Sequence, residues 1–300
     1  MPIAAFRNGD FSSLAKANPI FDPATGNPDG TGRSQFPNNM IDPARISPVS
    51  AALLATVPLP NLPGTDSNFI APLGQLTSDN STYGRVDYVI NESNHLFGRY
   101  THNSQVSKCT DTSAYGSGGA PPLALPFCGN DTGSQDIISV DYVHAFTPTF
   151  VVEGRFGDMI YRTVVNALDQ TKASSAAIGL KGLNDACPGC GGLAGFRIGG
   201  PVGGFNLGNT DHAHQIDNEG NYDYVGIATW TRGRHAVKFG TEINFANDHR
   251  FDSASQGNYG CFNVSGVCGP NGFSQSITGA PEVPGSGMSM ASFLLGKAST

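Results

Sequence analysis

The chain has 300 residues, enough for one or two domains with a hydrophobic core. Apolar residues make up 39% of it and charged residues only 14%, and 39 glycines and 20 prolines take much of the remaining share. This composition is typical of strands and long loops, and it argues against a mainly helical protein. The net charge of −7, without a basic cluster, excludes nucleic acid as an expected partner.

The sequence gives two opposing indications about export. No run of about 18 apolar residues occurs, so we expect no transmembrane helix, and the N-terminal MPIAAFRNGDF is too polar for a signal peptide. The six cysteines, however, lie in Gly-, Ser- and Pro-rich segments, which favours loop-closing disulfides and an oxidising compartment. Both indications hold if the export signal preceded this chain and was lost by truncation. The disulfide candidates, whose connectivity is left open, are Cys109 and Cys128, Cys187 and Cys190, and Cys261 and Cys268.

Residues 1–80 are predicted to form a loop-rich segment, because proline and glycine interrupt it throughout. One short helix is expected at about 48–56. Ser47 can cap this helix and Pro48 suits its first position.

Residues 81–300 are predicted to form a sheet, because apolar and polar residues alternate with the period of a strand. Three hairpins are expected, and each closes through a short turn. Long Gly- and Ser-rich segments follow each hairpin. The turns are expected at 91–94, 147–149 and 232–234, and the long segments at about 106–133, 167–217 and 251–288.

This order places every short turn at one end of an antiparallel sheet and every long loop at the other. Outer-membrane barrels have this asymmetry, whereas immunoglobulin-like sandwiches have connections of similar, modest length. We therefore predict an all-β fold, an antiparallel partial outer-membrane β-barrel of about six or seven long strands. Phe146, Phe150 and Trp230, close to the turns, would suit an aromatic girdle at the membrane interface.

The two sides of each strand are predicted to meet different solvents. In GIATWTRGRHAVKFGTEINF, residues 226–245, apolar side chains alternate with polar ones. Glu153 is expected to pair with Arg155, and Glu242 with Lys238. The lipid-facing candidates are Val237, Phe239, Ile243 and Phe245, and the lumen-facing candidates are Arg85, Asp87, Glu153, Arg155, Lys238 and Glu242.

Several stretches, taken in order, resemble the TonB-dependent outer-membrane receptors of the Oar-like family, which carry a carboxypeptidase regulatory-like domain. The series covers most of the chain outside its cysteine-bearing loops. The matching stretches include GDFSSL at 9–14, IFDPATG at 20–26, FPNNMIDPARISP at 36–48, GRVDYVINESNHLFGRYT at 84–101, HAFTPTFVVEGRFG at 144–157 and WTRGRHAVKFGTEI at 230–243.

The resemblance implies a transporter in the Gram-negative outer membrane, with a barrel closed by a plug and energised through TonB. This chain matches the region after the plug and the first barrel strands, so the resemblance implies a fragment. Its implied partners are the rest of the barrel and the plug, the TonB complex acting through that plug, outer-membrane lipid and an unknown ligand. No enzyme activity and no cofactor are expected.

Two alternatives belong to other classes. The first is a secreted or surface-attached soluble β-rich protein for binding or adhesion, in which Val237, Phe239 and Ile243 would pack beneath a second sheet. The second is a zinc-dependent enzyme, because thiolates and imidazoles are preferred zinc ligands. It requires convergence of Cys187, Cys190, His212 and His214.

Overall fold

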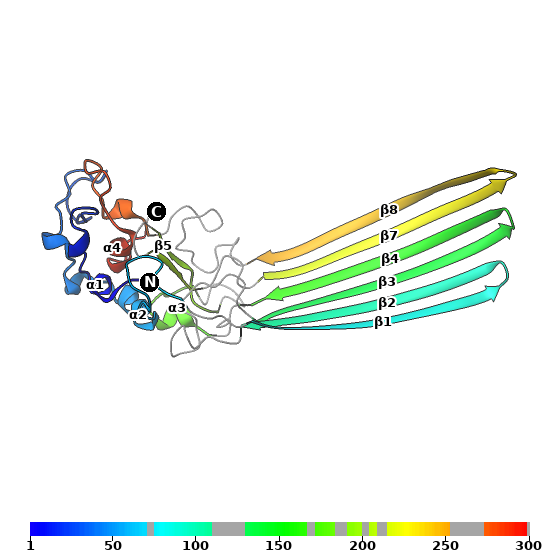
Figure 1. Ribbon diagram of the computed structural model, residues 1–300, viewed down its shortest axis with the longest axis horizontal. Coiled ribbons are helices and arrows are strands. Elements are labelled where there is room, and N and C mark those ends of the chain that lie inside the picture. Colours follow the sequence, from blue (N-terminus) through cyan, green and yellow to red (C-terminus); the bar gives the residue numbers. More distant parts are fainter. Residues whose placement is uncertain are drawn as a thin grey trace.

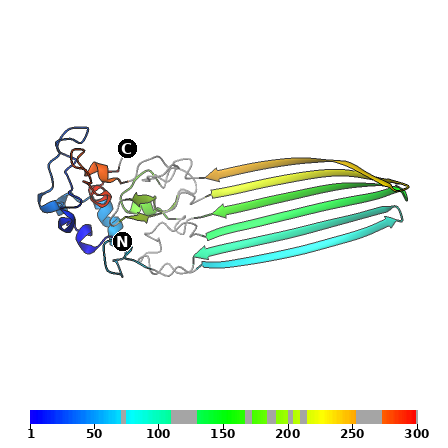
Figure 2. The ribbon, with the colours of Figure 1, turned by 45° about the horizontal axis from the view of Figure 1, so that its top comes forward.

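A long sheet projects from a compact body (Figure 1). Residues 1–70 and 273–298 both lie in the body, and a second view shows the sheet as one uncovered layer (Figure 2). The computed structural model describes residues 1–70, 75–109, 130–166, 172–183, 191–199, 204–208, 215–252 and 273–298.

The sheet is antiparallel throughout, with the order β1-β2-β3-β4-β7-β8. Its strands have 16 to 18 residues, or about 55 Å at roughly 3.3 Å per residue. Ordinary strands have about five or six residues, so the prediction of an all-β fold with long strands is confirmed. The strands are β1 Gln75–Asn91, β2 Asn94–Cys109, β3 Asn130–Thr147, β4 Phe150–Val165, β7 Gln215–Arg232 and β8 His235–Asp252.

Three two-residue turns close the hairpins at the end of the sheet far from the body (Figure 1). In the first, the Asn91 side chain accepts a hydrogen bond from the Ser93 amide at 3.0 Å. In the third, Gly233 has a φ of 61°, which glycine adopts without strain. The turns fall where the sequence predicts them. The turn residues are Glu92 and Ser93, Pro148 and Thr149, and Gly233 and Arg234.

The body consists of short helices and a two-stranded sheet, joined by irregular chain. No helix in the described residues is long and apolar enough to cross a membrane. The elements are α1 Ala4–Arg7, α2 Pro48–Thr56, α3 Ser174–Ala177, α4 Ser289–Leu294, β5 Phe196–Ile198 and β6 Phe205–Leu207, with 3-10 turns η1 Ser12–Leu14, η2 Pro37–Asn39, η3 Pro43–Arg45 and η5 Gln275–Ile277.

The core of the body is assembled from distant parts of the sequence. Phe293 of α4 is fully buried, and its ring centroid lies 5.0 Å from that of Phe273 and 6.3 Å from that of Phe196. Helix α2 has the predicted bounds and buries Leu53 and Leu54 in the same core. The described parts of the long loops therefore pack with residues 1–70.

Two polar side chains stabilise the irregular parts of the body. The Arg7 guanidinium donates to the carbonyls of Leu54 and Val57 at the end of α2, at 3.0 and 2.6 Å. Asn39 is only 1% exposed and has a φ of 60°. Its side chain accepts from the Ile20 amide at 2.7 Å and donates to the Phe11 carbonyl at 2.9 Å. Ser47, the expected cap of α2, makes no capping hydrogen bond with its side chain.

Candidate functional site

The register of the strands sorts their side chains onto two faces, because directly paired residues point to the same side of a sheet. One row joins Asp87, Phe97, Asp141, Arg155, Val225 and Glu242. All six predicted lumen-facing residues lie on the face of this row, and all four predicted lipid-facing residues lie on the other. The charged face comprises Arg85, Asp87, Arg99, Asp141, Glu153, Arg155, Asp217, Asp223, Lys238, Glu242 and Arg250. The apolar face carries Val86, Tyr88, Leu96, Ile138, Val140, Tyr142, Phe156, Tyr224, Val237, Phe239, Ile243 and Phe245, and, nearer the body, the carboxylates of Asp136 and Asp158.

Arg155 is the centre of an ion-pair network on the charged face. Its Nε donates to Asp141 Oδ2 at 2.8 Å, and its Nη2 donates to Glu153. The pairing of Glu153 with Arg155 is therefore confirmed. Closer to the sheet edge, the Arg85 guanidinium donates to Asp87 at 2.6 and 2.7 Å.

Lys238 and Glu242 lie on the charged face but do not form the predicted ion pair. Residues four apart on one strand are separated by about 13 Å, too far for direct contact. Asp141, in contrast, was missed by sequence reasoning although it is the most buried carboxylate of the face, at 2% exposed. It pairs directly with Arg155 across β3 and β4, and only the register between two hairpin strands could have revealed this.

On β3 the apolar face is the more exposed one. On β3, Val140 and Tyr142 are 39% and 41% exposed, whereas Asp141 between them is 2% exposed. The charged side chains are thus crowded together, as on the concave side of a curved sheet, and the apolar ones spread outward. A sheet of a water-soluble domain has the opposite arrangement, with its apolar side chains covered.

Among the described residues, no second layer covers the predicted lipid-facing side chains. Val237, Phe239, Ile243 and Phe245 are between 48% and 60% exposed. In the part of the chain that the structure describes, the main contacts of each long strand are with its neighbours in the sheet. The covering sheet required by a soluble binding or adhesion protein is therefore absent from the described residues.

Aromatic residues mark both limits of the apolar band. Phe146, Phe150 and Trp230 lie beside the turns, and the Phe146 and Phe150 rings are 5.6 Å apart. At the other limit, the Tyr100 hydroxyl donates to Asp136 at 2.6 Å, where the outer surface becomes polar. On β8 the band from Val237 to Phe245 extends about 27 Å along the strand. A tilt of roughly 40° reduces this to about 21 Å along the membrane normal, close to the ~25 Å apolar band of membrane barrels.

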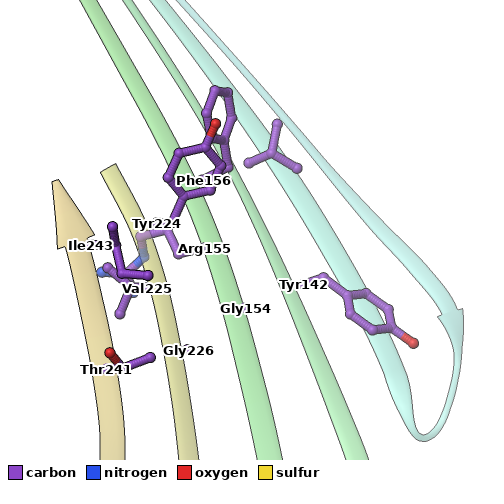
Figure 3. Close-up of a pocket in the computed structure, with 10 residues that line it drawn as sticks. Tyr142, Gly154, Arg155, Phe156, Tyr224, Val225, Gly226, Thr241 and Ile243 are labelled. Carbon is purple, nitrogen blue, oxygen red and sulfur yellow. The ribbon is translucent and has the colours of Figure 1, made fainter. Parts of the chain in front are cut away.

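A hollow interrupts the apolar face at two paired glycines, Gly154 and Gly226 (Figure 3). Its volume is about 390 Å³. The rings of Phe156 and Tyr224, which form part of its wall, have centroids 5.1 Å apart. The other lining residues are Val140, Tyr142, Arg155, Val225, Thr241 and Ile243.

The predicted cysteine and zinc sites fall almost entirely outside the described residues. Only the backbone of Cys109, at the end of β2, belongs to the described part. Within that part, no group of three or more His, Cys, Asp or Glu side chains could hold a metal ion. Disulfide formation remains a prediction for Cys109, Cys128, Cys187, Cys190, Cys261 and Cys268. Zinc binding remains a prediction for Cys187, Cys190, His212 and His214.

Comparison with known proteins places this geometry in a family. A search of curated proteins finds no match. The family model described as the outer membrane beta barrel domain matches residues 1–300, the whole chain. Long antiparallel strands, an exposed apolar band and a sheltered charged face are the features that such a domain requires. The chain therefore belongs to the outer membrane beta barrel domain family, and its open six-stranded sheet is part of such a barrel.

Proposed function

We propose that this chain forms part of the wall of a TonB-dependent transporter related to the Oar-like receptors, which takes up a ligand across the outer membrane. The observation that carries the proposal is the inverted burial on β3, where Asp141 of the charged face is buried between the exposed Val140 and Tyr142 of the apolar face. A wall of this kind separates an aqueous lumen from lipid. The resemblance of residues 84–101 and 230–243 to the Oar-like receptors supports the choice among barrel proteins.

Further strands must complete the wall. Within the described residues, neither the outer edge of β1 nor that of β8 pairs with another strand. Unpaired backbone N–H and C=O groups in hydrocarbon cost several kcal/mol each, so an open sheet does not persist in a bilayer. The proposed partners are therefore the rest of the barrel and a plug that occupies its lumen and contacts TonB.

The two ends of the sheet would have different roles. The short turns would face the periplasm, as in other membrane barrels. The body at the opposite end would face outward and form the surface that captures the ligand. Inside the wall, the charged face would contact the plug and the passing ligand. The lumen-facing residues would be Arg85, Asp87, Glu153, Arg155, Lys238 and Glu242.

The test compares uptake with and without energy coupling. The complete protein that carries this chain is expressed in otherwise identical cells with and without functional TonB, and depletion of compounds from a defined medium is followed by mass spectrometry. We expect at least one compound to be depleted only when both the protein and TonB are present. Depletion that requires the protein but not TonB would indicate a passive pore and contradict the proposal.

A further inference from the structure

The hollow on the apolar face exists because two glycines are paired across β4 and β7. A Cβ atom built on Gly154 meets no heavy atom within 4 Å, and one on Gly226 meets only Thr241 Cγ2, at 4.0 Å. The space above both glycines is therefore open toward the outside of the sheet (Figure 3).

The walls of this hollow are aromatic and held by one another. Phe156 and Tyr224 have ring centroids 5.1 Å apart, and Tyr224 also meets the edge of Phe245 at 6.3 Å. Such ring pairs fix the positions of the side chains. The hollow has a volume of about 390 Å³ and is open along the outer side of the sheet rather than enclosed.

The position of the hollow restricts what can fill it. It lies within the apolar band, between the aromatic residues near the turns and the first carboxylate on the same face, Asp158, which is in register with Ile138 and Tyr222. Arg155 also borders the hollow, but its guanidinium binds Asp141 on the opposite face of the sheet. A polar ligand would lose its hydrogen bonds to water and find few partners.

We propose that this hollow binds one acyl chain of an outer-membrane lipid. Because the family places the apolar face in the bilayer, acyl chains are the molecules that reach it. The surrounding lipid is as apolar as the hollow, so the gain comes from van der Waals contact with fixed rings. We therefore expect one ordered lipid that exchanges more slowly than its neighbours, whether or not the protein transports a ligand through TonB.

The test fills the hollow without altering its surroundings. The complete protein is placed in phosphatidylcholine vesicles that contain a phospholipid spin-labelled in the middle of its acyl chain. Electron paramagnetic resonance then gives the amount of motionally restricted lipid per protein. The variant is Gly154→Leu with Gly226→Leu. The control is Gly84→Leu, on the apolar face of β1, where an added Cβ also meets nothing within 4 Å.

We expect the filled variant to lose one restricted lipid per protein and the Gly84→Leu control to lose none. Equal values for the wild-type protein and the filled variant would overturn the proposal. A change in oligomeric state with no change in restricted lipid would also overturn it, because the hollow would then be a protein contact. If the filled variant does not fold, Tyr224→Ala removes a wall and should lower the restricted fraction. Tyr88→Ala, at an exposed position on the same face, should not lower the restricted fraction. Equal restricted fractions in these two variants would refute the binding of an acyl chain in the hollow.

Discussion

A lysine at Ile243 tests whether the apolar face contacts hydrocarbon. Ile243 lies within the apolar band, in register with Tyr224, and is 49% exposed in the absence of lipid. On a soluble protein, a charge at such an exposed site would change stability by about 0.5 kcal/mol or less. In a bilayer, Lys near the midplane of a barrel costs about 2–4 kcal/mol.

The matched control is Asn244→Lys, one residue farther along β8 on the charged face, in register with Asp223. Its lysine would meet an aqueous lumen and a carboxylate, so we expect a change in stability below about 0.5 kcal/mol. The assay is equilibrium unfolding of the complete barrel in urea from phospholipid vesicles. Equal stabilities of the two variants, or a larger loss for Asn244→Lys, would refute the assignment of the faces.

Three further predictions concern the charged face and the body. Arg155→Met should destabilise the barrel by about 1–3 kcal/mol in the same urea assay, because it leaves the sheltered carboxylate of Asp141 without its partner. Glu153→Gln retains an acceptor for Arg155 and should reduce stability less than Arg155→Met does. A larger loss of stability in Glu153→Gln would contradict the central place of Arg155 in the ion-pair network. In the body, Asn39→Leu should cost about 2–4 kcal/mol, because it removes three hydrogen bonds from a residue with positive φ. Limited proteolysis should therefore cleave residues 1–70 more rapidly in Asn39→Leu than in the control variant Asn38→Gly. Equal cleavage rates would contradict a stabilising role of the Asn39 side chain. The hydrogen bond from Arg45 holds the pKa of Asp22 below its usual value. The pair therefore stabilises the folded body at pH values above about 3.9, and the stabilisation is lost as the pH falls through the lower folded pKa. Arg45→Gln should cost about 0.5–1 kcal/mol at pH 7 and almost nothing near pH 2, whereas a cost independent of pH would exclude the ion pair as its cause.

The turns and the two faces could be predicted from the sequence because both depend on local patterns. Alternation of Lys238 and Glu242 with Val237, Phe239 and Ile243 defines two sides of a strand without any knowledge of its neighbours. The same pattern says nothing about how far a strand extends once both of its sides are polar. Strand β1 therefore begins at Gln75, several residues before its first apolar alternation, because backbone pairing with β2 does not require apolar side chains.

The body and the centre of the charged network could not be read from local patterns. Helix α4 is short, and its six residues are buried from all sides, so it lacks the amphipathic period that identifies a surface helix. Its core partners, such as Phe196 and Phe273, come from segments far away in the sequence. The pairing of Asp141 with Arg155 likewise depends on the register across a turn, which the sequence between them does not specify.

The most direct test of the membrane wall is a tryptophan scan along β8. Each residue from Val237 to Asn244 is replaced in turn by tryptophan, in a Trp230→Phe background of the complete protein. The variants are reconstituted in vesicles of acyl-brominated phosphatidylcholine, and quenching of the tryptophan fluorescence by bromine is measured. We expect strong quenching at Val237, Phe239 and Ile243 and weak quenching at Lys238, Glu242 and Asn244, with a period of two residues. Uniform quenching along the strand, or none at the apolar positions, would contradict a wall between lipid and water.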